Sequence, residues 1–487
     1  MPKFLVLNQA RLKLLALATL LLSNLPFPIL ALFCHPAFDD YDFTSRAMTL
    51  GFFRWEKVIY TTVTGRYFSM FLLYFNPLKF GGIVGFKTAT FLTVPILFVA
   101  AFAFINAFLQ STVTLADKLI LSAFFVGLFS NQMPEITEMY YVMTSRISYL
   151  LPSILTLVFF ALVLTASKKT KRIRLALQIL AGVLIFAIVG ASEISMLVLA
   201  LLIFSVTINL WLDKQKESWI WLVFSIVTMA CSAIVILAPG NTVRSAMFDS
   251  GQHRFIYSVG MSVRQELSFL IIWCSNLSFL FSTLLFIPLA ANLSDRIAFF
   301  KHVRFHPLVC SLLLLLLVFF GFFPAYWSMG MMGQFRTVNT VYFFFLIGWF
   351  LNIAIWIDYL KRKRNFEFAQ LPNYVYVISV PIILAALLFT NNTRPAFGDL
   401  ARGRAYRYDK AVYQRSVELR QCIRADIFVK NCPMVSISDL PTTITKPYYE
   451  TEFDMERYYW RIIEWRANPT LNPKLRRESL SGPQVLP

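Results

Sequence analysis

Long apolar runs recur along most of the chain, and short polar connections separate them. Many runs approach the ~20 residues that a helix needs to cross the hydrocarbon core of a bilayer. They are continuously hydrophobic and do not alternate, which is typical of spanning helices and not of barrel strands. The pattern predicts eleven spans: Leu14–Phe33, Phe86–Leu109, Leu119–Ser130, Ile147–Leu164, Ala176–Val189, Ile194–Leu212, Trp219–Leu237, Leu267–Ala290, Leu308–Phe323, Val338–Ile357 and Val375–Phe389. Leu119–Ser130 is short for a full span, and a buried half-span is the alternative.

Two stretches depart from this pattern. Residues 43–80 are too polar for a clean span and read as amphipathic helices on the membrane surface, broken at Thr64-Gly65 and Pro77. Residues 391–487 are polar, with arginine spacings that suit one or two helices. The expected fold is therefore an all-α integral membrane protein. It has a transmembrane domain at 1–390, whose first outer loop is 34–85, and a small C-terminal extracytoplasmic domain at 391–487.

Composition and charge support a multi-pass membrane protein. The chain is 57% hydrophobic and 15% charged, which is too apolar for a soluble domain of this length. Its net charge of +19 is explained by orientation signals and anionic lipid, so nucleic acid is a poor candidate partner. The N-terminal apolar stretch is longer than a signal-peptide core and predicts a retained first helix.

Basic residues predict the orientation. Positive clusters at 168–174, 296–304 and 361–364 fall on the same side as Lys3, Arg11 and Lys13, and that side is the cytoplasm. Eleven spans then leave the N-terminus in the cytoplasm and the C-terminus outside. One observation opposes this topology, because the predicted outer connection at 34–85 also carries five basic residues: Arg46, Arg54, Lys57, Arg66 and Lys79.

The cysteine and histidine residues give little evidence for a disulfide or a metal site. Cys422 and Cys432 lie in the polar tail, where a disulfide and two free thiols are both open. No cysteine–histidine spacing suggests zinc. His35 with Asp39 could hold a divalent metal, but the signal is weak, so no metal or other cofactor is expected.

The most concentrated polar stretch, 35–43, directly follows the first span and carries Asp39, Asp40 and Asp42. Carboxylates at the mouth of a membrane helix are costly to desolvate. Asp39 and Asp40 are therefore candidates for a catalytic centre. A solvated acidic loop that caps the next helix is the alternative.

The other polar features also fall on the predicted outer side. Glu193 joins two spans with almost no loop, which favours a paired or functional carboxylate over a snorkelling one. Arg244 and Arg336 suit either phosphate binding or the membrane interface. Tyr140 and Tyr141 suit either sugar stacking or interfacial anchoring. The remaining candidates each have a structural alternative as loop or turn residues: Glu135, Glu138 and Asn241.

These residues carry a resemblance to a known family. An acidic pair after the first helix, followed by Gly65-Arg66-Tyr67-Phe68-Ser69, resembles the multi-spanning GT-C glycosyltransferases, particularly bacterial members that decorate O-antigen or other surface glycans. The stretch 140–152 is similar to their aromatic–small–Tyr-Leu-Leu-Pro segment. Ala238-Pro239-Gly240-Asn241 with Arg244 is similar to a motif of related bacterial membrane proteins. The resemblance extends to about Thr337. This chain has Asp39-Asp40 where many relatives carry Asp-Glu, and 143–146 also departs from the family pattern.

The resemblance implies an inverting transferase in the bacterial inner membrane with a periplasmic site. Asp39 or Asp40 takes the acceptor proton, and Arg66, Arg244 and Arg336 hold the donor phosphate. The implied donor is a polyprenyl-phosphate sugar, such as a glucosyl donor, and the acceptor is a surface glycan or lipid-linked glycan such as O-antigen of lipopolysaccharide. A partner flippase and a donor-synthesising transferase follow from that donor. A transporter or flippase of lipid-linked glycans, or a non-catalytic component, is the alternative.

Overall fold

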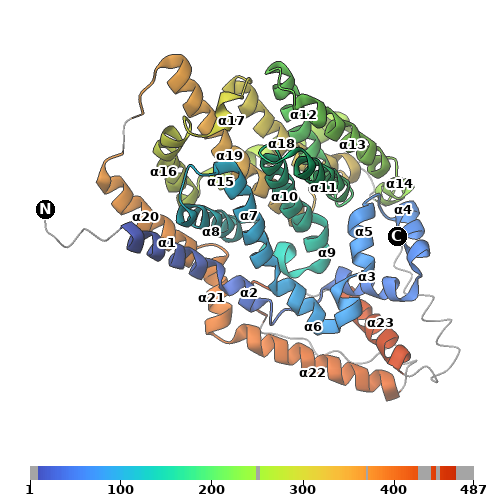
Figure 1. Cartoon of the computed structure of the whole chain (residues 1–487). Helices are drawn as coiled ribbons and strands as arrows, with labels where there is room; N and C mark the ends of the chain where they lie inside the picture. The colour runs from blue at the N-terminus through green and yellow to red at the C-terminus, as the bar shows by residue number, and fades with distance from the viewer. Residues whose placement is uncertain (1–8, 248–252, 369–370, 426–439, 446–449, 468–487) are drawn as a thin grey trace.

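The structure is a computed structural model of the whole chain, and it describes residues 9–247, 253–368, 371–425, 440–445 and 450–467 (Figure 1). Every regular element in these ranges is a helix. The fold is therefore all-α, as the sequence predicts. Helices long and apolar enough to cross a membrane make it a multi-pass membrane protein.

The first third of the chain alternates spans with shorter helices. Its elements are α1 (Gln9–Asn24), α2 (Pro26–Leu30), α3 (Phe38–Thr49), α4 (Phe52–Thr62), α5 (Tyr67–Tyr74), α6 (Pro77–Phe91), α7 (Thr93–Leu109), α8 (Leu115–Gln132), η2 (Thr137–Tyr141), α9 (Met143–Ser145), η3 (Arg146–Leu150) and α10 (Leu151–Ala166). The predicted interruptions of 43–80 are present, because α4 ends before Thr64-Gly65 and α6 begins at Pro77.

The remaining elements complete the bundle and the tail. They are α11 (Lys171–Val189), α12 (Glu193–Leu212), α13 (Ser218–Ile236), α14 (Pro239–Ser245), α15 (Phe255–Cys274), α16 (Leu277–Leu293), α17 (Ala298–Lys301), α18 (Pro307–Met329), α19 (Phe335–Arg364), α20 (Asn373–Phe389), α21 (Thr393–Ala401), α22 (Arg404–Ala425) and α23 (Glu450–Ala467).

The predicted count of eleven spans is not confirmed. The described residues contain 8 helices that could cross a membrane, or up to 10 if each of two bent pairs is one span. The predicted span Leu119–Ser130 forms part of α8, which is not among them; this helix carries Asp117 and Lys118 in its first turn.

The predicted span Leu267–Ala290 is not continuous. It divides into α15 and α16, which meet at 76°. Asn276 causes the break, because its side chain accepts the Ser278 amide and starts a new helix at that point. The last predicted span is likewise one arm of a bent pair, Tyr374–Phe389 with Thr393–Ala401.

The bundle has two chemically different ends. At one end, which we call the basic end, Lys361 reaches the Ala291 carbonyl at 2.7 Å and Asn209 reaches the His302 carbonyl at 2.9 Å. The positive clusters at 168–174, 296–304 and 361–364 belong to this end. The opposite end holds α3, α5, α6, α22 and α23, of which α6, α22 and α23 lie at the bottom of Figure 1 and α5 lies on the right.

The tail packs against residues 34–85, the segment predicted as the first outer loop. Helix α23 packs on α3, where the Tyr41 and Tyr459 rings lie 5.2 Å apart and Arg466 donates to the Met48 carbonyl at 2.6 Å. Buried Arg415 of α22 pairs with Glu456 of α23 at 2.8 Å. A separate C-terminal domain is thus not confirmed. The pairing of Cys422 with Cys432 cannot be followed, because Cys432 lies outside the described residues.

Candidate functional site

Three arginines from distant parts of the chain meet around one tyrosine. The guanidinium carbons of Arg66 and Arg336 lie 5.4 Å and 5.6 Å from the centre of the Tyr149 ring. Arg244 interacts electrostatically with both Arg66 and Tyr149. We call Arg66, Arg244 and Arg336 the arginine cluster. All three were predicted from the sequence as phosphate ligands, and the fold brings them together.

A close approach of two turns positions Arg66. A Cβ atom on Gly65 would lie 2.3 Å from the Val235 carbonyl oxygen, so only glycine fits against the end of α13. The Gly65 amide donates to the Asn241 side chain at 3.2 Å, and Asn241 in turn donates to Val235 at 2.7 Å. Asn241 therefore fastens the turn before Arg66 to α14, the helix that carries Arg244.

A second glycine turn brings a carboxylate to Arg66. The Phe68 amide donates to the Gly190 carbonyl at 2.8 Å, and Gly190 has no room for a Cβ because the Tyr67 ring lies over it. The chain then enters α12, whose first residue is Glu193. Arg66 Nη2 and Glu193 Oε2 form an ion pair of 2.6 Å.

The arginines differ in how well their charges are compensated. Arg66 pairs with Glu193, and Arg336 lies 3.4 Å from an Asp39 oxygen while it donates to Ser145 at 3.0 Å. Arg244 has no ion-pair partner in the ranges described, and the Arg66 charge beside it lowers its pKa. A half-buried cation held next to like charge is a ready ligand for an anion.

The two candidate aspartates have different surroundings. Both lie in the first turn of α3, so they belong to the helix itself and not to a loop before it. The Asp39 side chain is 37% exposed and faces Arg336. Asp40 is fully buried and accepts hydrogen bonds from the backbone amides of Ala37, Met143 and Thr144, at 3.1, 3.2 and 2.9 Å.

Asp40 thus acts as a clamp between α3 and α9. Burial raises its pKa to about 6, although its three amide donors act in the opposite direction. Its oxygens point at backbone amides, whereas an Asp39 oxygen is open to a bound molecule. Of the two carboxylates, Asp39 has the geometry of a proton acceptor.

Both glutamates after α8 bond to nearby backbone amides. Glu138 is buried and accepts a hydrogen bond from the backbone amide of Arg336 at 2.6 Å. This bond stabilises the N-terminus of α19 and holds the Arg336 backbone in place. Glu135 accepts the Thr137 amide at 3.3 Å. Asn339 holds this turn by bonding to both backbone groups of Glu135. Glu138 therefore touches the site through Arg336, and Glu135 supports the turn.

The tyrosine pair lies in the core and outside the arginine cluster. Tyr140 is 1% exposed with its hydroxyl 2.7 Å from Ser130, and Tyr141 is 2% exposed and donates to Phe27 at 3.0 Å. Neither ring is open to a sugar in this structure. Their burial follows from the irregular turns η2 and η3, which direct Tyr149 to the arginines instead.

Tyr149 is the residue that the sequence did not single out. It lies in the aromatic–small–Tyr-Leu-Leu-Pro stretch, which was a signal, but its ring had no distinguishing partner before the arginines were placed. Ser145 was missed in the same way. Both depend on contacts with residues far along the chain.

No group of histidine, cysteine, aspartate or glutamate in the described residues could hold a metal ion. His35 is buried, with its Nε2 atom 2.7 Å from an Asp409 oxygen. Lys87 pairs with the same carboxylate. His35 therefore joins the tail to the segment that precedes α3.

Protein families, curated proteins and solved structures were each compared with this chain, and none of them matches it.

Proposed function

We propose that the protein is an inverting membrane glycosyltransferase that moves a sugar from a polyprenyl-phosphate donor to a glycan acceptor. One observation carries the proposal: an open carboxylate, Asp39, faces a cluster of three arginines at one end of a multi-pass helical protein. A transferase of this kind needs both a proton acceptor and a site for an anionic leaving group.

The reaction proceeds in one displacement. An acceptor hydroxyl oxygen attacks the anomeric carbon of the donor sugar, and its proton passes to a carboxylate oxygen of Asp39. The bond from the anomeric carbon to the phosphate oxygen breaks as the new glycosidic bond forms. The electron pair leaves with the lipid phosphate, whose added charge is stabilised by Arg244 and Arg336.

The charge balance favours a monophosphate donor. Glu193 pairs with Arg66 and Asp39 pairs with Arg336, whereas the charge of Arg244 has no ion-pair partner in the described residues. A sugar linked through one phosphate to a lipid carries one negative charge before transfer. It therefore neutralises the cluster, whereas a pyrophosphate adds further charge that calls for a metal ion.

The arrangement also suggests where the donor enters. The site lies at the end of the spanning helices, so the hydrocarbon chain can stay in the bilayer while only phosphate and sugar reach the polar groups. We place this end in the periplasm of a bacterial inner membrane, opposite the positive clusters. The acceptor is then a surface glycan or a lipid-linked precursor, O-antigen being the leading candidate.

The decisive experiment is an assay of purified protein in detergent with polyprenyl-phosphate sugars and, separately, with nucleotide sugars. We expect transfer from the lipid-linked donor, no transfer from the nucleotide sugar, and no loss of activity with chelator. Lipid-linked sugar that crosses vesicle membranes without turnover would instead identify a transporter. Comparison of surface glycans by mass spectrometry, with and without the gene, then identifies the acceptor.

A further inference from the structure

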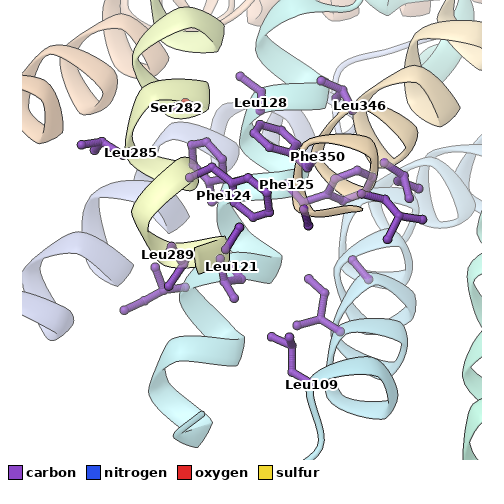
Figure 2. Close-up of a pocket in the computed structure, with 18 of the residues that line it drawn as sticks. Leu109, Leu121, Phe124, Phe125, Leu128, Ser282, Leu285, Leu289, Leu346 and Phe350 are labelled. Atoms are coloured by element: carbon purple, nitrogen blue, oxygen red, sulfur yellow. The ribbon is translucent and has the colours of Figure 1, made fainter. Parts of the chain in front are cut away.

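A large apolar cavity lies inside the bundle, well away from the arginine cluster. It has a volume of about 470 Å³, is partly open between the helices, and is lined mainly by α7, α8, α16 and α19, with contributions from α1, α10, α17 and α20. Figure 2 shows leucine and phenylalanine side chains from several helices pointing toward one another across it, among them Phe124, Phe125 and Phe350.

The lining is almost purely hydrocarbon. Ser282 is its one hydroxyl-bearing residue, and that hydroxyl already donates to the Ser278 carbonyl. A purely apolar cavity does not hold ordered water; one of ~150 Å³ stays dry and takes up apolar ligands. This cavity is much larger and falls in the usual size range of ligand sites, ~300–1,000 Å³. Its chemistry therefore selects a hydrocarbon chain.

The cavity lies closer to the basic end than to the arginine cluster. Along α19 its lining begins at Leu346 and ends at Ala354. At a rise of ~1.5 Å per residue, Leu346 is about 15 Å beyond Arg336, whereas Ala354 is about 10 Å from Lys361. A lipid whose headgroup lies at the basic end reaches the cavity directly. A donor held at the arginine cluster has its phosphate at the far end.

Two lysines flank the cavity at the basic end. Lys361 donates to the Ala291 carbonyl at 2.7 Å and pairs with Asp295 at 2.5 Å, and the neighbouring Ala290 lines the cavity. Lys118 donates to Asn106 at 2.8 Å, next to the lining residue Ile105. Asp295 and Asp358 offset part of the charge at the end of α19, but four basic residues there, Lys361, Arg362, Lys363 and Arg364, leave it positive. Positive charge beside a hydrocarbon slot matches a lipid with an acidic headgroup.

We propose that this cavity binds one acyl chain of an anionic glycerophospholipid from the leaflet at the basic end. The phosphate of that lipid lies near Lys361 and Lys118, and the site is separate from the donor site. It is independent of the proposed transferase activity, since it follows from the cavity and the lysines alone.

The test uses the full chain purified in detergent and native mass spectrometry. Phosphatidylglycerol and phosphatidylcholine with identical acyl chains are added in turn, and bound lipid is counted. We expect about one phosphatidylglycerol per chain. Ala354→Phe and Ala290→Phe place a ring in the cavity and should each reduce its retention on the order of ten-fold.

Matched controls separate this site from the outer surface. Leu312→Phe adds a ring on an exposed face of α18 and should leave retention unchanged. Lys361→Gln should reduce the preference for phosphatidylglycerol, whereas Lys363→Gln, on the exposed end of α19, should not. Thermal unfolding confirms that each variant is folded; two cavity variants are used in case one is not.

Two results would overturn the proposal. The first is equal retention of phosphatidylglycerol by wild type, Ala354→Phe and Ala290→Phe. The second is an isoprenoid phosphate, co-purified with the wild type and lost from the cavity variants, because it would make the cavity part of the donor site. Sugar transfer is not a readout here, so failure of the transferase proposal leaves this test intact.

Discussion

Asp39 and Asp40 are adjacent, yet their surroundings give them different tasks. Asp39 is partly exposed, and its one ion pair among the described residues is the 3.4 Å approach to Arg336, so its replacement disturbs little else. We expect Asp39→Asn to reduce kcat by a factor of about 10² to 10⁴, the usual contribution of a general base. The measurement is sugar transfer from the lipid-linked donor, with membrane insertion checked in parallel.

Asp42→Asn is the matched control for this prediction. Asp42 lies on the same helix, but it pairs with Arg46 four residues on and not with a residue of the arginine cluster. Its activity should stay close to that of wild type. If Asp39→Asn keeps wild-type turnover, Asp39 is not the base and the displacement mechanism is wrong.

Arg244 is the cation of the cluster whose charge has no counterpart among the described residues. We expect Arg244→Gln to lower kcat/KM by about 10- to 100-fold, the effect of losing one hydrogen bond to a charged group. Stability should change little, because no ion pair is broken. Arg254→Gln, an exposed arginine before α15, serves as the control.

A second assay tests what Arg244 binds. If it holds the donor phosphate, binding of the polyprenyl-phosphate sugar must weaken in Arg244→Gln while acceptor binding does not. An unchanged donor affinity with weaker acceptor binding would assign Arg244 to the acceptor instead.

Asp40 makes a pH-dependent contribution to stability. Burial raises its pKa from 3.8 to about 6, so the folded protein holds this proton more strongly than the unfolded chain. The contribution therefore favours folding as pH falls from about 6 toward 4, and it is lost as pH rises through 6. The span corresponds to roughly 2–3 kcal/mol.

Thermal unfolding of wild type and Asp40→Asn, measured in detergent from pH 7.5 to pH 5, isolates this contribution. The difference between their melting temperatures should shift in favour of wild type as pH falls. Parallel curves across the range would show that Asp40 does not titrate there.

At the level of single residues, the sequence predicted which charged residues belong to the site better than it predicted whether a given side chain is buried. Arg66, Arg244 and Arg336 were selected because the lipid-phosphate leaving group implied by the resemblance needs arginine partners, and the fold brings them to one ring. Tyr140 and Tyr141 were also selected as candidate site residues, but a tyrosine in an apolar run can lie either in the core or at the surface. Which it is depends on contacts with Ser130 and Phe27, and these follow from tertiary packing.

At the level of elements, the site depends on the turn between α4 and α5. Gly65→Ala places a methyl group 2.3 Å from the Val235 carbonyl and 2.8 Å from Ala238 Cβ. The turn must then move away from α13, and Arg66 moves with it. We expect destabilisation of about 1–3 kcal/mol together with a loss of transfer activity.

Gly182→Ala in α11 is the control for that change. Nothing lies within 4 Å of a Cβ at Gly182, so alanine should leave stability equal or raise it by up to ~1 kcal/mol. A Gly65→Ala protein as stable and active as Gly182→Ala would contradict the close approach of the two turns.

The length of the apolar runs predicted where the helices occur, but it did not predict where two of the spans bend. The interruptions near Thr64 and Pro77 carry glycine and proline signals and were anticipated. The bend at 275–276 has only Ser275 and Asn276, which are too few polar residues to stand out between two apolar arms. Helix α8 was counted as a span because the prediction used only its apolar part, Leu119–Ser130, and left out the charged first turn before it.

At the level of the whole molecule, the chain separates two kinds of charge. Arginines that pair with acidic residues lie at the end that holds α3, α5 and α14. Clusters of mainly basic residues lie at the other end. The described tail belongs to the first end, because α23 packs on α3 and His35 contacts Asp409. Orientation of one end in the membrane therefore fixes the site, the tail and the lipid cavity together.

Single-cysteine labelling tests this orientation. Tyr413 is 68% exposed on α22, and Lys169 is exposed in the connection between α10 and α11, so Tyr413→Cys and Lys169→Cys report the two ends. In a background with all six native cysteines replaced, a membrane-impermeant maleimide should label Tyr413→Cys in cells with a permeabilised outer membrane. Lys169→Cys should react only after the inner membrane is opened, because positive connections stay in the cytoplasm. The reverse pattern would place Asp39 and the arginine cluster in the cytoplasm, where nucleotide sugars are available, and would remove the main reason for expecting a lipid-linked donor.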